Sequence, residues 1–311
     1  MSDIIVHHYP GSPFSEKLRL ILGSKQLSWR SVIIPVVMPK PDLLALTGAY
    51  RRTPVMQLGC DIYCDTALIA EVVDSLSPTA PLFPAGHAAS ARMAARWADA
   101  SVFSAAVSYT FQPQGLARLF PDPSQVAALF EDRKPFLVGG SAQVVISPTD
   151  AASILVGAID WIEAELTGSH AAFLGGATPS VLDFSLYHGF WMLQGAAMLE
   201  ALITERPLVT AWFKRISAIG HGKPVDMSSA DAIAVARAAA PMPPEAFDPS
   251  GVEGLTPGDA VEVAATDYGV DATQGTLVTA TRREFVIARE DPRAGKVHVH
   301  FPRIGFRIAK R

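Results

Sequence analysis

Two serines near the start of the chain are the first residues whose type and position could do chemistry. Ser12 and Ser15 lie in the segment 9–15, between an apolar stretch at 4–6 and a helical pattern at 16–22. The first N–H groups of a helix lack partners within it, so a hydroxyl there can help to hold an anion. Serine is also a common N-cap, which is the alternative role. Without a cysteine, this segment cannot perform thiol–disulfide exchange.

Two further motifs follow, each able to hold part of a ligand. Thr53 and Pro54 precede an apolar run, and sequence alone favours the trans form of this bond, because cis X–Pro bonds are uncommon. Asp65 and Thr66 open an apolar helix at 66–76. The free N–H groups of its first turn attract a carboxylate, although Asp65 could equally be an ordinary N-cap.

Strands and helices alternate around these motifs. Runs rich in β-branched residues predict strands, and apolar residues spaced three and four apart predict helices. The predicted strands cover residues 4–6, 31–34, 55–58 and 62–64, and the predicted helices cover residues 16–22, 41–47 and 66–76.

This order of motifs and elements resembles the thioredoxin-like domain of the glutathione transferase superfamily. Ser12 matches the catalytic position, where omega-like members carry Cys and tau-like or zeta-like members carry Ser. The resemblance implies that the Ser12 hydroxyl donates a hydrogen bond to the sulfur of glutathione and favours its thiolate. Phe14, in the same motif, is expected among the glutathione-binding residues.

The resemblance also assigns the two later motifs. It implies that the Thr53–Pro54 bond is cis and that the Thr53 main chain pairs with the cysteinyl part of glutathione. Asp65 and Thr66 match the acid–hydroxyl pair that binds the γ-glutamyl end, with Thr in place of the usual Ser. The Asp65 carboxylate would pair with the ligand ammonium.

Two cations lie in stretches suited to the glycine carboxylate of glutathione. Lys40 follows a Pro-rich turn, and Arg52 directly precedes the Thr53 motif. The alternative for each is a solvated surface charge with little energetic role.

The chain divides into three predicted domains. Residues 1–80 form the thioredoxin-like, glutathione-binding domain, and a Pro-rich connector follows at 77–84. Residues 88–240 form an all-helical domain like that of the transferases, in which Ser180 and Asp183 resemble the capping box of the superfamily. The predicted helices cover residues 88–111, 123–134, 149–166, 180–200, 205–219 and 228–240.

Residues 246–311 depart from the two-domain pattern, and the resemblance does not extend to them. Alternating apolar residues on five short runs predict a small antiparallel, barrel-like β module. The runs are 261–263, 275–278, 284–288, 297–301 and 306–308. The role of this module does not follow from the sequence.

Composition restricts the classes of partner. The 311 residues are 49% hydrophobic and 18% charged, with a net charge of -4, which argues against nonspecific nucleic-acid binding. No run of about eighteen apolar residues indicates a membrane span, and no secretory leader is visible, so we expect a cytoplasmic protein. Cys60 and Cys64 match no redox or zinc spacing and are expected to be buried apolar residues in a reducing compartment.

A hydrophobic pocket for the second substrate is expected on the first long helix of the helical domain. Tyr109 and Phe111 are the candidates, with core packing as the alternative. No metal site is expected: His7 and His8 point to opposite faces of a strand, and a pair at His298 and His300 lacks an evident third ligand.

Together, the sequence predicts a glutathione transferase-like enzyme that uses glutathione as co-substrate, without a metal. The glutathione thiolate, activated by Ser12, would attack a small hydrophobic electrophile, and the resemblance implies a homodimer. The alternatives are a non-catalytic interaction protein that uses the C-terminal module and a glutathione-dependent isomerase or dehalogenase.

Overall fold

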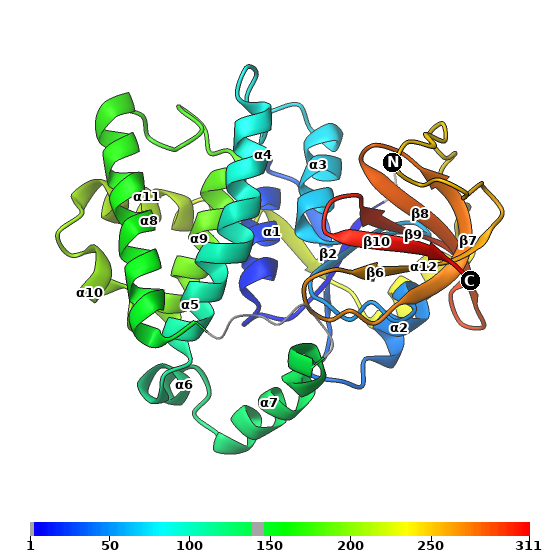
Figure 1. Ribbon diagram of the computed structural model, residues 1–311, viewed down its shortest axis with the longest axis horizontal. Coiled ribbons are helices and arrows are strands. Elements are labelled where there is room, and N and C mark those ends of the chain that lie inside the picture. The colour runs from blue at the N-terminus through cyan, green and yellow to red at the C-terminus, as the bar shows by residue number, and fades with distance from the viewer. Residues whose placement is uncertain (1–2, 139–145) are drawn as a thin grey trace.

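The computed structural model describes residues 3–138 and 146–311 and contains one ten-stranded sheet (Figure 1). The strand order is β10-β6-β7-β8-β9-β4-β3-β1-β2-β5. A helical half packs beside one end of this sheet, and a curved antiparallel part forms the other end (Figure 1). The thioredoxin-like part is therefore joined to the C-terminal module by continuous strand pairing.

The predicted thioredoxin-like part is confirmed, and its four strands are adjacent near the β5 end of the sheet. The central strand β1 is buried throughout, because helices cover both of its faces. It pairs in parallel with β2 and antiparallel with β3, which pairs with β4. The elements are β1 (Ile4–His8), α1 (Pro13–Ser24), β2 (Ser28–Ile33), α2 (Pro41–Thr47), β3 (Val55–Leu58), β4 (Asp61–Cys64) and α3 (Thr66–Leu76).

The predicted all-helical domain is confirmed, but two of its predicted helices differ from the observed ones. The predicted helix 88–111 contains a π-helical turn at Ala98–Val102, and the predicted helix 180–200 breaks after Gly195. Among the described residues no helix is both long and apolar enough to cross a membrane. The helices are α4 (Ala88–Trp97), α5 (Phe103–Thr110), α6 (Pro113–Leu119), α7 (Pro123–Val138), α8 (Pro148–Ser169), α9 (Val181–Gly195), α10 (Glu200–Ile203) and α11 (Pro207–Ser217).

Two elements near the end of the helical range belong to the sheet region instead. Strand β5 (Lys223–Asp226) pairs in parallel with β2 and forms an exposed edge. Helix α12 (Ser229–Ala238) packs against α2, β2 and β9 rather than against the other helices of the C-terminal half. The chain thus returns to the thioredoxin-like part before the C-terminal strands begin.

The predicted antiparallel module is confirmed, and it forms an open part of the large sheet rather than a closed barrel. Strand β9 pairs in parallel with β4, with Asp61 opposite His298 and Tyr63 opposite His300. Apolar residues of both regions share one core, in which Ile5 and Val32 cluster with Ile287. The strands are β6 (Ala260–Ala265), β7 (Thr273–Ala280), β8 (Glu284–Asp291), β9 (Gly295–Pro302) and β10 (Phe306–Lys310).

Both cysteines are buried and free, as predicted. Cys60 directly precedes β4 and Cys64 is its last residue, and burial raises the pKa of the Cys60 thiol to about 11. Burial also raises the pKa of the Cys64 thiol. Because the thiolate is the reactive form, these thiols act as packing groups.

His300 joins the two parts of the sheet through a buried ionic cluster. Its Nε2 lies 3.1 Å from Asp61 Oδ1 on β4, and its Nδ1 lies 2.9 Å from Glu284 Oε2 on β8. Burial alone would lower the pKa of His300, but the two carboxylates outweigh it and raise that pKa. Burial would raise the pKa of Glu284, but the hydrogen bond and charge of His300 hold it below its usual value. Both ring nitrogens face carboxylate oxygens, which only accept hydrogen bonds, so this geometry favours the imidazolium form of His300.

The cluster predicts a pH-dependent stability. The contribution of His300 is complete below its unfolded pKa of 6.5 and is lost as the pH rises through its raised folded pKa. The contribution of Glu284 is present above 4.5 and is lost as the pH falls. We expect His300→Gln to lower the free energy of unfolding by about 3 kcal/mol at pH 6 and by less at pH 9.

Urea unfolding at several pH values measures this difference. His87→Gln is the control, because His87 is exposed and lies outside the cluster. An equal loss at pH 6 and pH 9 would mean that the imidazolium adds nothing beyond packing.

Candidate functional site

Ser12 lies at the junction of β1 and α1, where the sequence placed it. It is the N-cap of α1, and its Oγ accepts a hydrogen bond of 3.2 Å from the Ser15 backbone N–H. Pro13, the first residue of the helix, has no N–H to leave unpaired. Ser12 is only 3% exposed. The capping role is thus confirmed. Because the cap uses a lone pair of the oxygen, Ser12 can still donate its hydroxyl proton to a ligand.

Tyr9 lies next to Ser12 and was not among the residues singled out from the sequence. Burial raises the pKa of Tyr9, and the nearby Arg133 guanidinium and Ser12 hydroxyl oppose that rise. The phenol is therefore neutral and can donate a hydrogen bond. Its place directly before the motif at 10–15 was the available signal.

Lys40 and Thr53 are brought together, as the predicted site requires. The Thr53–Pro54 bond is cis, as predicted. Lys40 Nζ lies 3.3 Å from Thr53 Oγ1 and 3.5 Å from the Arg51 carbonyl oxygen. Burial, with help from the charges of Arg133 and Arg51 and against that of Asp132, lowers the pKa of Lys40 to about 8. A buried cation thus lies beside the main chain expected to bind glutathione.

Asp65 and Thr66 begin α3 as predicted. Asp65 is the N-cap, and its Oδ1 accepts a hydrogen bond of 2.9 Å from the Ala67 N–H. Its φ of 71° lies in the left-handed region, which turns its backbone sharply into the helix. Thr66 is buried. The N-cap alternative is therefore observed, and the remaining carboxylate oxygen can still pair with an ammonium.

Arg52 points toward the C-terminal strands rather than toward Thr53. Its guanidinium forms an ion pair with Asp267, donates to the Tyr268 carbonyl and lies 4.2 Å from the centre of the Tyr268 ring. These contacts supply its charge and its terminal NH2 groups with partners, while its Nε has none among the described residues. To bind the glycine carboxylate the guanidinium would have to leave them.

The aromatic candidates have separate surroundings. Phe14 packs between α5 and α9, with its ring 4.6 Å from that of Phe103 and 4.5 Å from that of His188. Tyr109 packs against the helical core, which was the alternative reading. Phe111 meets Phe130 of α7 edge to face at 6.0 Å. Among the described contacts, none joins Tyr109 or Phe111 to Ser12 or Thr53.

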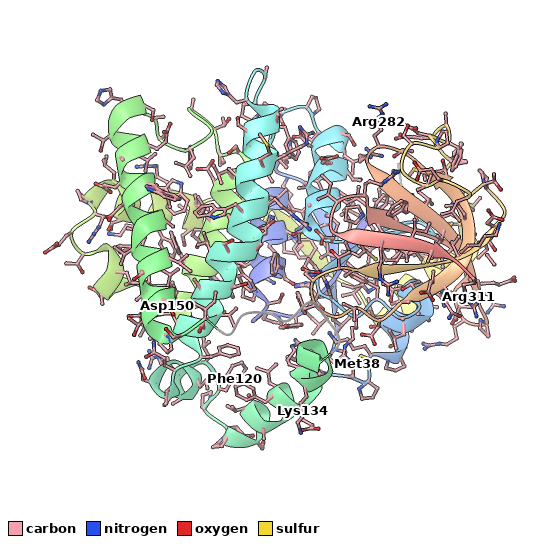
Figure 2. All side chains as sticks on the ribbon, viewed as in Figure 1. Met38, Phe120, Lys134, Asp150, Arg282 and Arg311 are labelled. Carbon is pink, nitrogen blue, oxygen red and sulfur yellow. The ribbon has the colours of Figure 1, made fainter. Side chains whose placement is uncertain are left out.

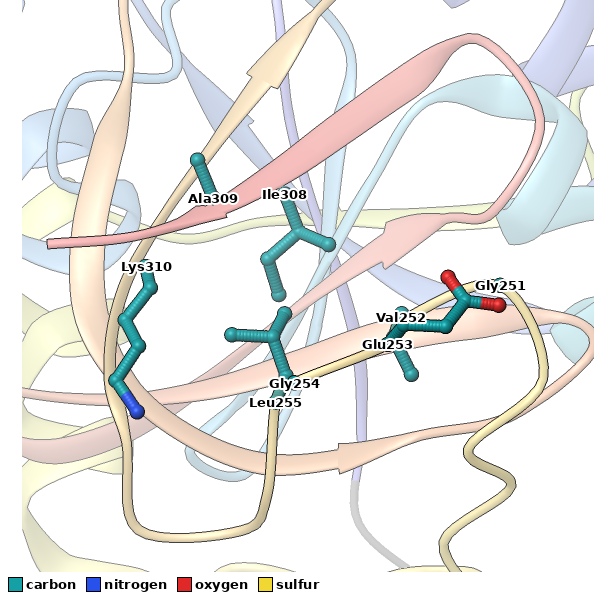
Figure 3. Close-up of a pocket in the computed structure, with 8 residues that line it drawn as sticks. All are labelled: Gly251, Val252, Glu253, Gly254, Leu255, Ile308, Ala309 and Lys310. Atoms are coloured by element: carbon teal, nitrogen blue, oxygen red, sulfur yellow. The ribbon is translucent and has the colours of Figure 1, made fainter.

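Two surface hollows lie away from these residues. One, of about 460 Å³, is lined by segments 251–255 and 308–310 at the outer face of the C-terminal strands (Figure 3). The other lies between α8 and the start of α11, near Asp160 and Arg206. Within residues 3–138 and 146–311, no group of His, Cys, Asp and Glu side chains has the arrangement of a metal site. His7 and His8 instead bond to Gln57 and Ser31.

Comparisons with known proteins place this geometry in a family. Residues 6–81 match the family model for the glutathione S-transferase N-terminal domain, and residues 149–215 match the model for the C-terminal domain. A GST-like protein from Pseudomonas syringae is 39% identical, with a TM-score of 0.80 over 100% of both chains. That alignment includes the C-terminal strands. A comparison with curated proteins gives no significant match.

More distant structures share the fold alone. A glutathione S-transferase from Rhodospirillum rubrum is 17% identical, with a TM-score of 0.52 over 69% of this chain and 88% of its own. A tau class glutathione S-transferase from mango, Mangifera indica, is 15% identical, with a TM-score of 0.51 over 70% of this chain and 89% of its own. With both domain models matched in order and a GST-like relative 39% identical over the whole chain, the chain belongs to the glutathione S-transferase superfamily.

Proposed function

We propose that the protein is a glutathione transferase in which Ser12 activates the sulfur of bound glutathione. The observation that carries the proposal is the Ser12 hydroxyl at the start of α1, with the cis Thr53–Pro54 bond and buried Lys40 in the same domain. Membership of the superfamily supports glutathione as the ligand.

In the proposed reaction, glutathione loses its thiol proton to solvent. The thiolate then attacks an electrophilic carbon, a C–S bond forms, and a leaving group such as chloride departs with the electron pair of its bond. The Ser12 hydroxyl donates to the thiolate, so the thiol pKa falls and more of the nucleophile is present at neutral pH. Holding both reactants in one site supplies the remaining rate enhancement.

The other predicted residues orient glutathione in this proposal. The Thr53 main chain pairs with the cysteinyl part, and Pro54 holds that strand end in place. Asp65 pairs with the ammonium of the γ-glutamyl end, while N–H groups at the start of α3, near Thr66, meet its α-carboxylate. Lys40 meets the glycine carboxylate. A cytoplasmic homodimer is part of the same proposal.

Isothermal titration with reduced glutathione tests the binding part of the proposal. We expect binding in the micromolar-to-millimolar range and about tenfold weaker binding by Asp65→Asn, because the variant keeps the cap oxygen but loses the charge. Asp160→Asn, at an exposed ion pair with Arg206, is the matched control. If titration of the wild-type protein up to about 10 mM glutathione gives no heat of binding, the transferase proposal fails.

A further inference from the structure

Helix α7 lies outside both segments that match the family models, yet it docks on the thioredoxin-like part. The Asp132 carboxylate is 7% exposed, accepts a hydrogen bond of 2.9 Å from the Met38 N–H and forms an ion pair with Arg51. Figure 2 labels Lys134 of α7 and Met38 of the thioredoxin-like part in the lower part of the molecule, where Met38 contacts the helix. The helix is therefore held at a defined position beside the predicted glutathione site.

Arg133 lies on α7 near the Tyr9 hydroxyl. Its Nη1 lies 2.8 Å from Asp132 Oδ2. Both its guanidinium and the Ser12 hydroxyl are near enough to Tyr9 to oppose the rise that burial causes in the pKa of that phenol. About a third of the Arg133 side chain is exposed. A ligand group bound near the Tyr9 hydroxyl would thus lie close to a guanidinium.

The described side chains around Tyr9 carry an excess of positive charge. The charges of Arg133 and Arg51 help to lower the pKa of Lys40, and Asp132, which forms ion pairs with both arginines, opposes them. Burial of like charges is costly unless an opposite charge compensates them. Lys40 is 2% exposed and its ammonium donates to neutral oxygens. A carboxylate on a ligand beside Arg133 would offset part of this positive charge.

An apolar ring lies on the same face of α7 as Arg133. Phe130 is three residues earlier, so the two side chains are neighbours on the helix surface. Phe130 is 47% exposed, and its inner edge packs on Phe111 of the helical half. One helix face therefore offers a half-exposed aromatic ring and a guanidinium within one turn.

We propose that this face of α7 binds the second substrate and that this substrate is an apolar acid. Its carboxylate pairs with Arg133, and its apolar body packs on Phe130 and Phe111. This selectivity replaces the purely hydrophobic electrophile expected from the sequence. The assignment of this ligand as the electrophile rests on the proposed function, whereas its binding to α7 does not.

Equilibrium binding of an unreactive pair of probes tests the site without turnover. The probes are 3,5-dinitrobenzoate and its uncharged analogue 3,5-dinitrobenzamide, followed by quenching of tryptophan fluorescence. We expect the acid to bind about tenfold more tightly than the amide, and Arg133→Gln to remove that difference. Arg133→Lys should restore part of it by keeping the charge.

Lys134→Gln is the matched control, because Lys134 is exposed and pairs with Glu131 at the surface. It should leave both affinities unchanged. Equal affinity for acid and amide in the wild-type protein overturns the proposal, as does an equal preference in wild type and Arg133→Gln.

A rate measurement with 4-chloro-3,5-dinitrobenzoate and its amide then connects the site to the reaction. The glutathione thiolate replaces chloride in both, and kcat/KM for the acid should exceed that for the amide by about tenfold in wild type only. Arg133-dependent binding of the acid without turnover would leave the α7 site standing and remove the transferase proposal. Turnover with no preference for the acid would support the transferase proposal and overturn the α7 site.

Discussion

Replacing Ser12 with alanine should lower kcat for glutathione conjugation about a hundredfold and change the Kd for glutathione by less than about threefold. In the proposed mechanism the hydroxyl acts on the sulfur, so its loss should raise the thiol pKa while the proposed contacts of Thr53, Lys40 and Asp65 remain. The pH–rate profile should accordingly shift to higher pH in the variant. Steady-state rates across pH, together with titration calorimetry, measure both effects.

Ser12 also caps α1, so the control must separate capping from chemistry. Loss of the cap costs about 1 kcal/mol of unfolding free energy, which urea unfolding detects independently. Ser15→Ala is the matched variant: Ser15 Oγ is buried and has no hydrogen-bond partner among the described residues. If Ser15→Ala slows the reaction as much as Ser12→Ala, the Ser12 hydroxyl is not the activating group.

The largest expected loss of stability is at Asp183, three residues after the cap of α9. Its carboxylate accepts hydrogen bonds from Ser180 N and Oγ, from the N–H groups of Leu174 and Gly175, and from Trp212 Nε1, at 2.8 to 3.1 Å. Asp183→Ala leaves these donors buried without an acceptor. We expect the free energy of unfolding to fall by about 5 kcal/mol.

Urea unfolding followed by far-UV circular dichroism measures this loss. Asp160→Ala removes an exposed ion pair with Arg206 and should cost less than about 1 kcal/mol. Asp183→Asn should lie between the two, because its amide oxygen still accepts some of these bonds while its NH2 group faces donors. A cost below about 2 kcal/mol for Asp183→Ala would contradict the assigned network.

The local features of the fold could be predicted because short-range physics determines them. The strand at β1, the cap at Ser12 and the capping box at Ser180 and Asp183 each depend on residues within a few positions. The cis bond at Thr53–Pro54 required the family resemblance, since sequence alone favours trans.

The features that sequence reasoning missed depend on distant partners. Strand β5 contains a proline and is exposed along its length, so neither periodicity nor burial marks it as a strand. The pairing of β4 with β9 joins segments with no shared pattern. Arg52 was placed at the ligand because it precedes Thr53, whereas Asp267 lies 215 residues away and determines its direction.

The same limit applies to the candidate site. Ser12, Thr53 and Asp65 are carried by motifs, so their local geometry followed from the sequence. Arg133 lies on a helix that no motif connects to Tyr9, and only the folded chain brings them together.

The parallel pairing of β4 with β9 has a consequence for synthesis on the ribosome. His300, which lies between Asp61 and Glu284, is 239 residues after Asp61 in the chain. At about 5–20 residues per second, β4 emerges roughly 12–48 s before the strand that covers it. During that interval β4 is an open edge, able to pair with another nascent chain. The sheet of the N-terminal half is therefore completed only after the last residues are translated. Chaperones that bind exposed strands would act during this interval.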